Sequence, residues 1–253
     1  MIDRPEPYDA AVSFLDEHFP DAVAAFLGGS VVTEHRTPTS DLDITVVMAD
    51  LPTPYRETFW HEGWLVEAFV HTRDSLDYYF ERDEERRVRT MFRLCSDSVV
   101  VVDRAGTAAE IRQHAAERLE AGPPEPSQEQ VDTLRYSLSS LLDDLAGADR
   151  EDELAFISGQ VLGQAAELAL LAAGEWSGIG KALARELGAF DPDLAERLVN
   201  AHRMVVTEGD TAPLYRCALQ VLDSAGGPLL AGFRQEAPAA AAAHRRPAPD
   251  KQA

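Results

Sequence analysis

The sequence predicts an α+β fold, in which an N-terminal domain with a mixed β-sheet and flanking helices is followed by an all-α helical bundle. Three observations support this class. Short apolar runs alternate with helical patterns as far as residue 121, only helical patterns follow, and a proline-rich stretch (GPPEP) separates the two regions. We therefore expect domains at 1–122 and 127–235, and a disordered tail at 236–253, where alanine and proline dominate.

The N-terminal elements follow from the spacing of apolar side chains. Residues 8–19 repeat them at helical intervals before Pro20 ends the pattern. Helical character returns at 73–94 and at 107–121. Four short apolar runs are typical of buried strands: 23–27, 42–48, 64–70 and 98–102. The alternation of the two element types predicts a sheet with helices packed against it.

The region after the proline-rich stretch contains helix signals only. Ser127 and Gln130 form a capping box before a segment whose leucines fall on one helical face. An alanine-rich segment at 151–173 predicts a second, closely packed helix. Asp191 and the proline after it begin another helix, and a last one spans residues 213–225. Together these segments predict a bundle of about five helices.

The chain is strongly acidic, with a formal net charge of -21. Nucleic-acid binding draws most of its affinity from Lys and Arg residues that neutralise phosphates, so no nucleic-acid partner is expected. A small cationic substrate or a protein partner suits this charge better, and a role in solubility alone explains it equally well.

The sequence predicts a cytoplasmic protein. No apolar run reaches 18 residues, so no membrane-spanning helix is expected. The acidic start, MIDRPEPYDAAV, is unlike a signal peptide. Cys95 and Cys217 lie far apart in the sequence and indicate neither a disulfide framework nor a metal site.

Two aspartates at the start of a strand point to chemistry. Asp41 and Asp43 begin the run at 42–48, and because side chains alternate along a strand, both carboxylates face one side with Cα atoms roughly 6.5–7 Å apart. Carboxylates placed in this way repel each other unless a cation lies between them, and hard oxygen ligands favour Mg²⁺. Glu67, the single charge within WLVEAFV, supplies a third carboxylate if its strand lies beside the first.

A glycine-rich turn lies upstream of the aspartates. Gly28, Gly29 and Ser30 directly follow an apolar run. Glycines at such a position let the backbone approach a phosphate, and backbone N–H groups at the start of a following helix would hold that phosphate. Ser30 adds a hydroxyl donor.

These residues resemble the signature of the DNA polymerase beta-like nucleotidyltransferase superfamily, in which Gly-Ser precedes Ser-Asp-x-Asp at a strand start and a later strand carries a third acidic residue. Here the two parts are Gly29-Ser30 and Ser40-Asp41-Leu42-Asp43. The resemblance covers roughly residues 20–105. The helical region is similar in layout to that of aminoglycoside nucleotidyltransferases.

The resemblance implies an enzyme that moves a nucleoside monophosphate, AMP from ATP in the expected case, to a hydroxyl group of a small-molecule acceptor and releases pyrophosphate. It implies two Mg²⁺ ions held by the expected catalytic residues, Asp41, Asp43 and Glu67. The nucleotide is expected to bind at four residues of the motif: Gly28, Gly29, Ser30 and Ser40.

The chain also departs from the family pattern. Many relatives carry Arg-Gly where this chain has Thr33 and Glu34, so Arg36 is the expected replacement cation for the nucleotide. Asp74 is an alternative third carboxylate, although it also suits a helix N-cap. Lys181 follows two glycines at a helix start, and it either contacts a phosphate of the nucleotide or is a solvated surface residue.

Two other functions stay open at this point. A protein-modifying or antitoxin-like nucleotidyltransferase would act on a partner protein, and a catalytically silent module would only bind a nucleotide, which Thr33 and Glu34 favour. Asp143 and Asp144 are candidates for a general base in the helical domain or part of a solvated helix face. The sequence leaves a homodimer open.

Overall fold

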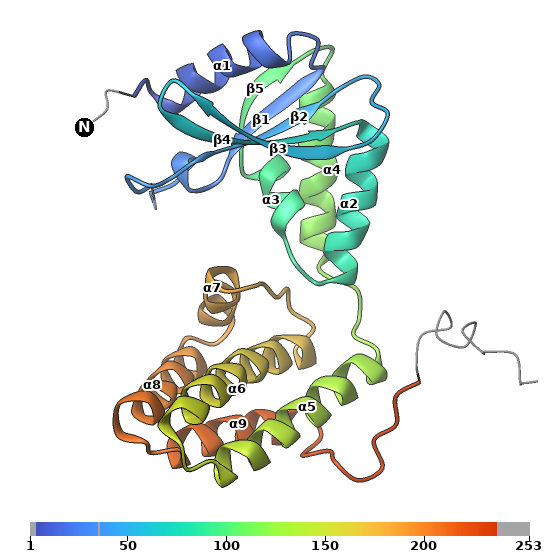
Figure 1. Ribbon diagram of the computed structural model, residues 1–253. Helices are drawn as coiled ribbons and strands as arrows, with labels where there is room; N and C mark the ends of the chain where they lie inside the picture. The colour runs from blue at the N-terminus through green and yellow to red at the C-terminus, as the bar shows by residue number, and fades with distance from the viewer. Residues whose placement is uncertain (1–3, 35, 237–253) are drawn as a thin grey trace, which may run out of the picture. The chain divides into compact units, whose positions relative to one another are not determined.

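The computed structural model describes residues 4–34 and 36–236, and it confirms the predicted α+β class (Figure 1). Contacts divide the chain into two compact units: residues 1–125 with 173–186, and residues 126–172 with 187–253. Compared with the expected boundaries, residues 173–186 pack with the N-terminal unit although they lie within the helical part of the sequence. The expected disordered tail lies outside the described residues, apart from Glu236.

The first unit contains a five-stranded mixed sheet with the strand order β3-β4-β2-β1-β5. Its strands are β1 (Ala24–Gly28), β2 (Leu42–Val47), β3 (Tyr55–His61), β4 (Trp64–His71) and β5 (Val99–Asp103). Strands β2 and β4 are parallel, and the other neighbouring pairs are antiparallel. The sequence did not predict β3, because this edge strand exposes most of its side chains and lacks an apolar alternation.

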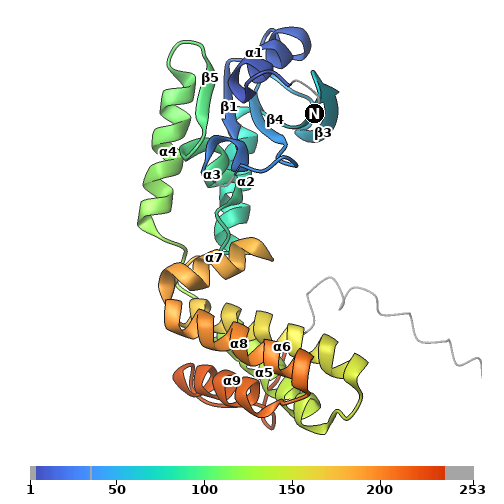
Figure 2. The same cartoon turned by 90° about the vertical axis from the view of Figure 1, so that its left-hand side faces the viewer.

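Helices cover both faces of the sheet (Figures 1 and 2). Helix α1 (Pro7–His18) packs on one face, where Phe14 meets Ile44 and the other inward residues of β2 and β4. The opposite face carries α2 (Arg73–Glu85), α3 (Thr90–Ser96) and α4 (Thr107–Ala121). Its core includes Phe26 and Val47 from the strands and Phe80 and Phe92 from the helices. Because side chains alternate along a strand, the residues of β2 that share a face with Val47 include Asp43.

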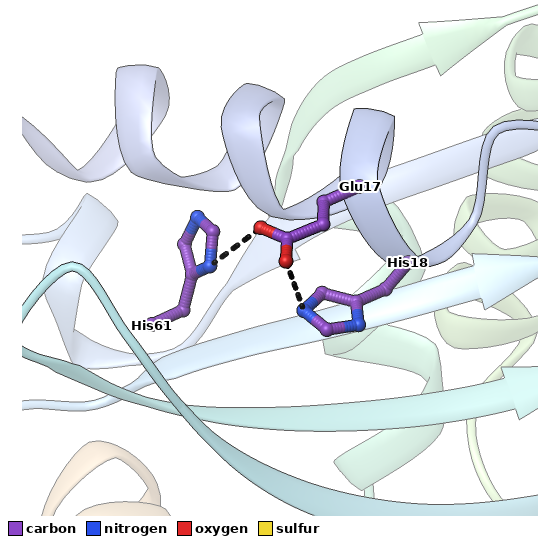
Figure 3. A group of neighbouring side chains, drawn as sticks. All are labelled: Glu17, His18 and His61. Carbon is purple, nitrogen blue, oxygen red and sulfur yellow. Dashed lines mark ion pairs between the residues drawn. The ribbon is translucent and has the colours of Figure 1, made fainter.

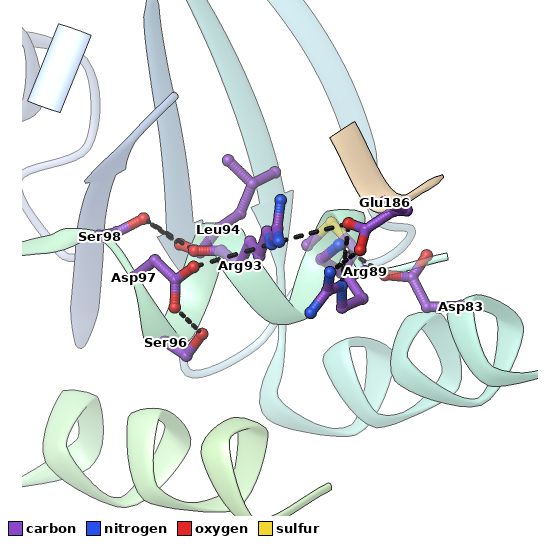
Figure 4. Close-up of polar contacts among 9 residues, drawn as sticks. Asp83, Arg89, Arg93, Leu94, Ser96, Asp97, Ser98 and Glu186 are labelled. Carbon is purple, nitrogen blue, oxygen red and sulfur yellow. Dashed lines mark hydrogen bonds and ion pairs between the residues drawn. The ribbon is translucent and has the colours of Figure 1, made fainter. Parts of the chain in front are cut away.

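The helical segment expected at 73–94 is two helices. Thr72 begins α2 through a capping box with Ser75, so the residue that caps this helix is Thr72 and not Asp74. The chain then turns at Arg87, which has a positive φ of 53°. Asp83 accepts a hydrogen bond of 2.6 Å from the backbone N–H of Met91, and this bond secures the first turn of α3 against α2 (Figure 4).

The segment 173–186 is anchored to the first unit at several points. Trp176 packs edge-on against Phe92, with ring centroids 5.7 Å apart. Arg87 donates to the backbone carbonyl of Glu175 at 2.9 Å. Arg89 and Arg93 both pair with the carboxylate of Glu186, which is 7% exposed (Figure 4). Helix α7 (Lys181–Phe190) begins within this anchored segment.

The second unit is helical. Its helices are α5 (Gln128–Gly147), α6 (Glu151–Ala172), α8 (Pro192–Glu208) and α9 (Ala212–Ser224). The capping box of Ser127 with Gln130 is present, and Asp191 caps α8 by accepting a hydrogen bond of 2.8 Å from the N–H of Leu194. Helix α6 packs against α5, α8 and α9 and forms the centre of this unit.

Within the described ranges, α6 is the one helix long and apolar enough to cross a membrane by length and composition. Its most apolar 18-residue window has a mean hydropathy of 1.4, and half of that window is buried. The central helix of a helical unit meets the same criterion, so this property of α6 is weak evidence for a membrane segment.

Candidate functional site

The register of the parallel strands brings three carboxylates together. Asp43 of β2 is the Cα partner of Glu67 of β4. Their neighbours in sequence, Leu42 and Val66, point into the core under α1, so both carboxylates project from the opposite face. Asp41 precedes β2 by one residue and shares that face. One oxygen atom from each of the three carboxylates lies within 4.8 Å of the others.

Gly29, which directly precedes Ser30, leaves room for the carboxylate of Asp43 because it has no side chain. Gly29 has φ 77° and ψ -166°, a conformation that is nearly restricted to glycine. A Cβ atom on Gly29 would lie 2.0 Å from Oδ2 of Asp43. Glycine is therefore required both by the backbone conformation and by the close approach of the Asp43 side chain.

Gly28 and Ser30 flank this close approach. Gly28 is the last residue of β1 and is the Cα partner of Asp43. Ser30 begins a single 3₁₀ turn (Ser30–Val32), so the helix expected to hold a phosphate at its N-terminus is reduced to that turn. What remains for a ligand at this position is the Ser30 hydroxyl and the backbone around Gly29.

Ser30 and Ser40 form a direct hydrogen bond, although they lie ten residues apart in the sequence. Their hydroxyl oxygens are 2.8 Å apart. Ser40 is 6% exposed, and its hydroxyl also accepts a hydrogen bond of 2.9 Å from the N–H of Thr37. Ser40 thus closes the loop between the glycine turn and β2, and it holds Ser30 beside the carboxylates.

The electrostatics of the cluster favour a bound cation. Burial raises the pKa of Asp43 to about 6, and the charges of Asp41 and Glu67 act in the same direction. Arg56 and Lys181 act in the opposite direction on the pKa of Asp43. Three carboxylates on a partly buried face are stabilised when a positive charge lies among them.

Arg56 is a site residue that the sequence did not indicate. It lies on β3 and forms an ion pair with Glu67, while its guanidinium group stacks over Phe69 at 5.2 Å from the ring centroid. Only the pairing of β3 with β4 brings Arg56 to this position. Because β3 lacks a clear strand pattern, no local signal in the sequence identifies this contact.

The structure separates the two cations that were expected at the nucleotide. Lys181, the first residue of α7, lies close enough to Asp43 to lower the pKa of that carboxyl group. Arg36 instead pairs with Glu6 at 3.4 Å and lies over Trp64, 5.4 Å from the ring centroid. Trp64 belongs to the core under α1, so Arg36 is not brought to the carboxylates.

The alternative third carboxylate, Asp74, lies in the first turn of α2 and is not in the cluster of Asp41, Asp43 and Glu67. The three clustered residues offer only carboxylate oxygens, which are the ligands preferred by hard divalent ions such as Mg²⁺. Two carboxylates in register on neighbouring strands, with a third one residue ahead of β2, fit such an ion.

No protein-family model matches the sequence, and no curated protein matches it. Among solved structures, the chain is similar to a nucleotidyltransferase-like protein from Exiguobacterium sibiricum 255-15, with a TM-score of 0.46 and 14% identical residues. The alignment covers 86% of this chain and 73% of that chain. This likeness concerns the fold alone, and an assignment of function has to come from the site.

Proposed function

We propose that this protein is a Mg²⁺-dependent nucleotidyltransferase that moves AMP from ATP to a hydroxyl group of a small-molecule acceptor and releases pyrophosphate. One observation carries the proposal: the carboxylates of Asp41, Asp43 and Glu67 converge within 4.8 Å beside the turn at Gly29 and Ser30. Such a set of oxygen ligands suits divalent ions that act on a triphosphate.

The three carboxylates are the residues that would hold Mg²⁺. When bound there, divalent ions neutralise the charge of the triphosphate and increase the acidity of the acceptor hydroxyl. Asp43 would be the central ligand, because it is paired with Glu67 in register and lies against Gly29. Arg56 holds the carboxylate of Glu67 in place on the side of the edge strand.

The groups around Asp43 suit a triphosphate. Gly29 has no side chain, so the backbone there stays accessible to phosphate oxygens. The Ser30 hydroxyl lies next to it and is oriented by Ser40. Lys181 adds a positive charge within range of Asp43, which favours a phosphate contact over a purely solvated role for this residue.

The proposed reaction is a displacement at the α-phosphorus of ATP. The oxygen of the acceptor hydroxyl forms a bond to the α-phosphorus, and the bond from that phosphorus to the β-phosphate oxygen breaks. The hydroxyl proton passes to a carboxylate of the cluster or to water, and pyrophosphate carries away the negative charge of the leaving oxygen. The protein contributes positioning and charge stabilisation, which are the main sources of rate in phosphoryl transfer.

The net charge of -21 bears on the charge of the acceptor molecule. An acidic chain attracts cationic small molecules and repels nucleic acids, so we propose a small cationic acceptor and no nucleic-acid partner. A cytoplasmic location, where ATP and Mg²⁺ are both supplied, is part of the same proposal.

The test uses ATP labelled on the α-phosphate, Mg²⁺ and a panel of aminated and neutral polyols. The expected result is pyrophosphate release together with label on one of the small molecules. Label on a protein band would instead support a protein-modifying enzyme. Binding of an ATP analogue without pyrophosphate release from any acceptor would support a silent nucleotide-binding module and contradict the proposed activity.

A further inference from the structure

A second group of metal-ligating side chains lies on the α1 side of the sheet. Glu17 and His18 are the last two residues of α1, and His61 is the last residue of β3 (Figure 3). The His61 ring packs edge-on against Phe14, which belongs to the core under α1. This cluster is therefore separated by the sheet from the carboxylates of Asp43 and its neighbours.

The ligand atoms lie close to the spacing of a metal site. Nδ1 of His61 is 3.7 Å from one carboxylate oxygen of Glu17, and Nε2 of His18 is 3.9 Å from the other (Figure 3). One atom from each of the three residues lies within 4.8 Å of the other two. Two ligands of a tetrahedral Zn²⁺ ion, each at about 2.0–2.1 Å from the metal, lie about 3.4 Å apart. Small side-chain rotations therefore suffice to close the site.

A hydrogen-bond relay sets the tautomer of His61. Nε2 of His61 is 3.2 Å from the hydroxyl oxygen of Ser13, and Ser13 donates to the carboxylate of Glu62 at 3.3 Å. Because the hydroxyl hydrogen is used on Glu62, the Ser13 oxygen accepts from Nε2–H of His61. Nδ1 of His61 then faces the Glu17 carboxylate, a geometry in which the two groups can act as ligands of one cation.

The backbone fixes the residues of this relay. Glu62 and Gly63 have positive φ angles of 46° and 80° and form the two-residue turn between His61 and Trp64. Two such residues form the tight turn that matches the twist of a hairpin. His61 itself is 8% exposed, so its ring has little freedom to leave the cluster.

The His18 ring is also held in position. It packs against Phe14 and Phe59 with centroid distances of 4.7 and 5.0 Å. These contacts leave Nε2 directed at Glu17 (Figure 3). A shallow groove of about 750 Å³ along α1 is lined by Ser13 and Glu17, among others, and it gives solvent access next to the cluster.

We propose that Glu17, His18 and His61 bind a Zn²⁺ ion, with water in the fourth position. Two imidazole nitrogens and one carboxylate form a ligand set typical of zinc and unlike the all-oxygen set that suits Mg²⁺. The ion would join the end of α1 to the end of the exposed edge strand β3. A metal that binds only the folded state stabilises that state increasingly as the metal concentration rises. Zn²⁺ at this site would therefore raise the free energy of unfolding of the unit that contains β3.

The test is a titration of the full-length, chelator-treated protein with Zn²⁺ by calorimetry, in the presence of excess Mg²⁺. We expect one equivalent of Zn²⁺ to bind and the melting temperature to rise. Co²⁺ provides a spectroscopic probe, because tetrahedral coordination by nitrogen and oxygen produces visible absorption bands. Glu17→Gln and His18→Gln are each expected to weaken Zn²⁺ binding at least tenfold and to abolish these bands.

The variants separate this site from the carboxylate cluster. Glu17 is an exposed side chain and His18 is partly exposed, so both variants are expected to keep the circular dichroism spectrum of the wild type. Asp43→Asn, which alters the other cluster, is expected to leave Zn²⁺ affinity unchanged. The proposal is overturned if the wild type binds no Zn²⁺, if both α1 variants bind it as tightly as the wild type, or if Asp43→Asn removes the binding.

Discussion

Asp43 of β2 and Glu67 of β4 are paired residues on neighbouring parallel strands, and both carboxylates project from the face of the sheet that α2, α3 and α4 cover. Strand pairing of this kind keeps the two side chains close whatever their own interaction energy. The backbone of the sheet therefore holds these two carboxylates close together despite the repulsion between their negative charges.

The first prediction concerns the metal ligands. Asp43→Asn should lower nucleotidyl transfer by about a hundredfold or more, because it removes a charged ligand from the centre of the site. The measurement is pyrophosphate release at saturating ATP and Mg²⁺, with circular dichroism to show that the fold is retained. Asp50→Asn, an exposed aspartate outside the cluster, is the matched control and should keep wild-type turnover. Full turnover by Asp43→Asn would contradict the assignment.

A second prediction tests the close approach at the glycine turn. Gly29→Ala places a methyl group 2.0 Å from Asp43 Oδ2 in a backbone conformation that costs a non-glycine residue about 1–3 kcal/mol. Both the free energy of unfolding and the transfer rate should fall, which urea denaturation and pyrophosphate release measure.

Gly106→Ala is the matched control for this change. Gly106 also has a positive φ, 80°, but no atom outside its immediate chain neighbours lies within 4 Å of the position that a Cβ atom would occupy there. This control should lose about 1 kcal/mol of stability from the backbone alone and no activity. Equal losses of activity in the two variants would show that the contact with Asp43 is unimportant.

A third prediction concerns the segment that carries Lys181. Glu186→Gln removes the carboxylate that Arg89 and Arg93 share, and it should destabilise the first unit by about 1–3 kcal/mol. Because this anchor holds the start of α7, the KM for ATP should rise more than kcat falls. Thermal denaturation and steady-state kinetics measure the two effects.

Asp152→Asn is the control for this change, and it breaks an ion pair with Arg150 in which both side chains are more than 60% exposed. It should have little effect on stability, because an exposed ion pair contributes little, and it should leave the KM for ATP unchanged. If Glu186→Gln also left the KM for ATP unchanged, this result would contradict the proposed contact between Lys181 and the nucleotide.

A fourth prediction concerns the dependence of stability on pH. His71 is 4% exposed, and burial lowers its pKa from 6.5 to about 4. Between these values the unfolded chain binds a proton at His71 and the folded chain does not, so the free energy of unfolding decreases as the pH falls from 6.5 to 4. The full effect of a shift of this size is roughly 3 kcal/mol.

His71→Gln should remove this part of the pH dependence, which urea denaturation at a series of pH values measures. At about pH 8, above both pKa values, the free energy of unfolding of the variant differs from that of the wild type only through the lost packing against Tyr79 and the lost contact with Ser75. The difference in stability between variant and wild type should then shrink as the pH falls. A constant difference from about pH 8 to about pH 4 would contradict the prediction.

Local signals were sufficient for much of the fold. The caps at Ser127 and Asp191 were readable because a capping hydrogen bond involves residues three apart in the chain. The turn between α2 and α3 was not readable, because Arg87 adopts a positive φ without glycine or proline to mark it. Edge strand β3 was also missed, since its register depends on pairing with β4 and not on its own apolar pattern.

By itself, the sequence determined that Asp41 and Asp43 share one face of a strand, because the alternation of side chains is a property of the strand alone. It also determined that a Gly-Ser turn precedes them by about ten residues. Only the tertiary structure decided that Glu67 lies in register with Asp43, that Arg56 and Lys181 approach this cluster while Arg36 does not, and that His61 meets Glu17. These contacts join residues far apart in the chain, and strand order and helix packing, which no local pattern encodes, bring them together.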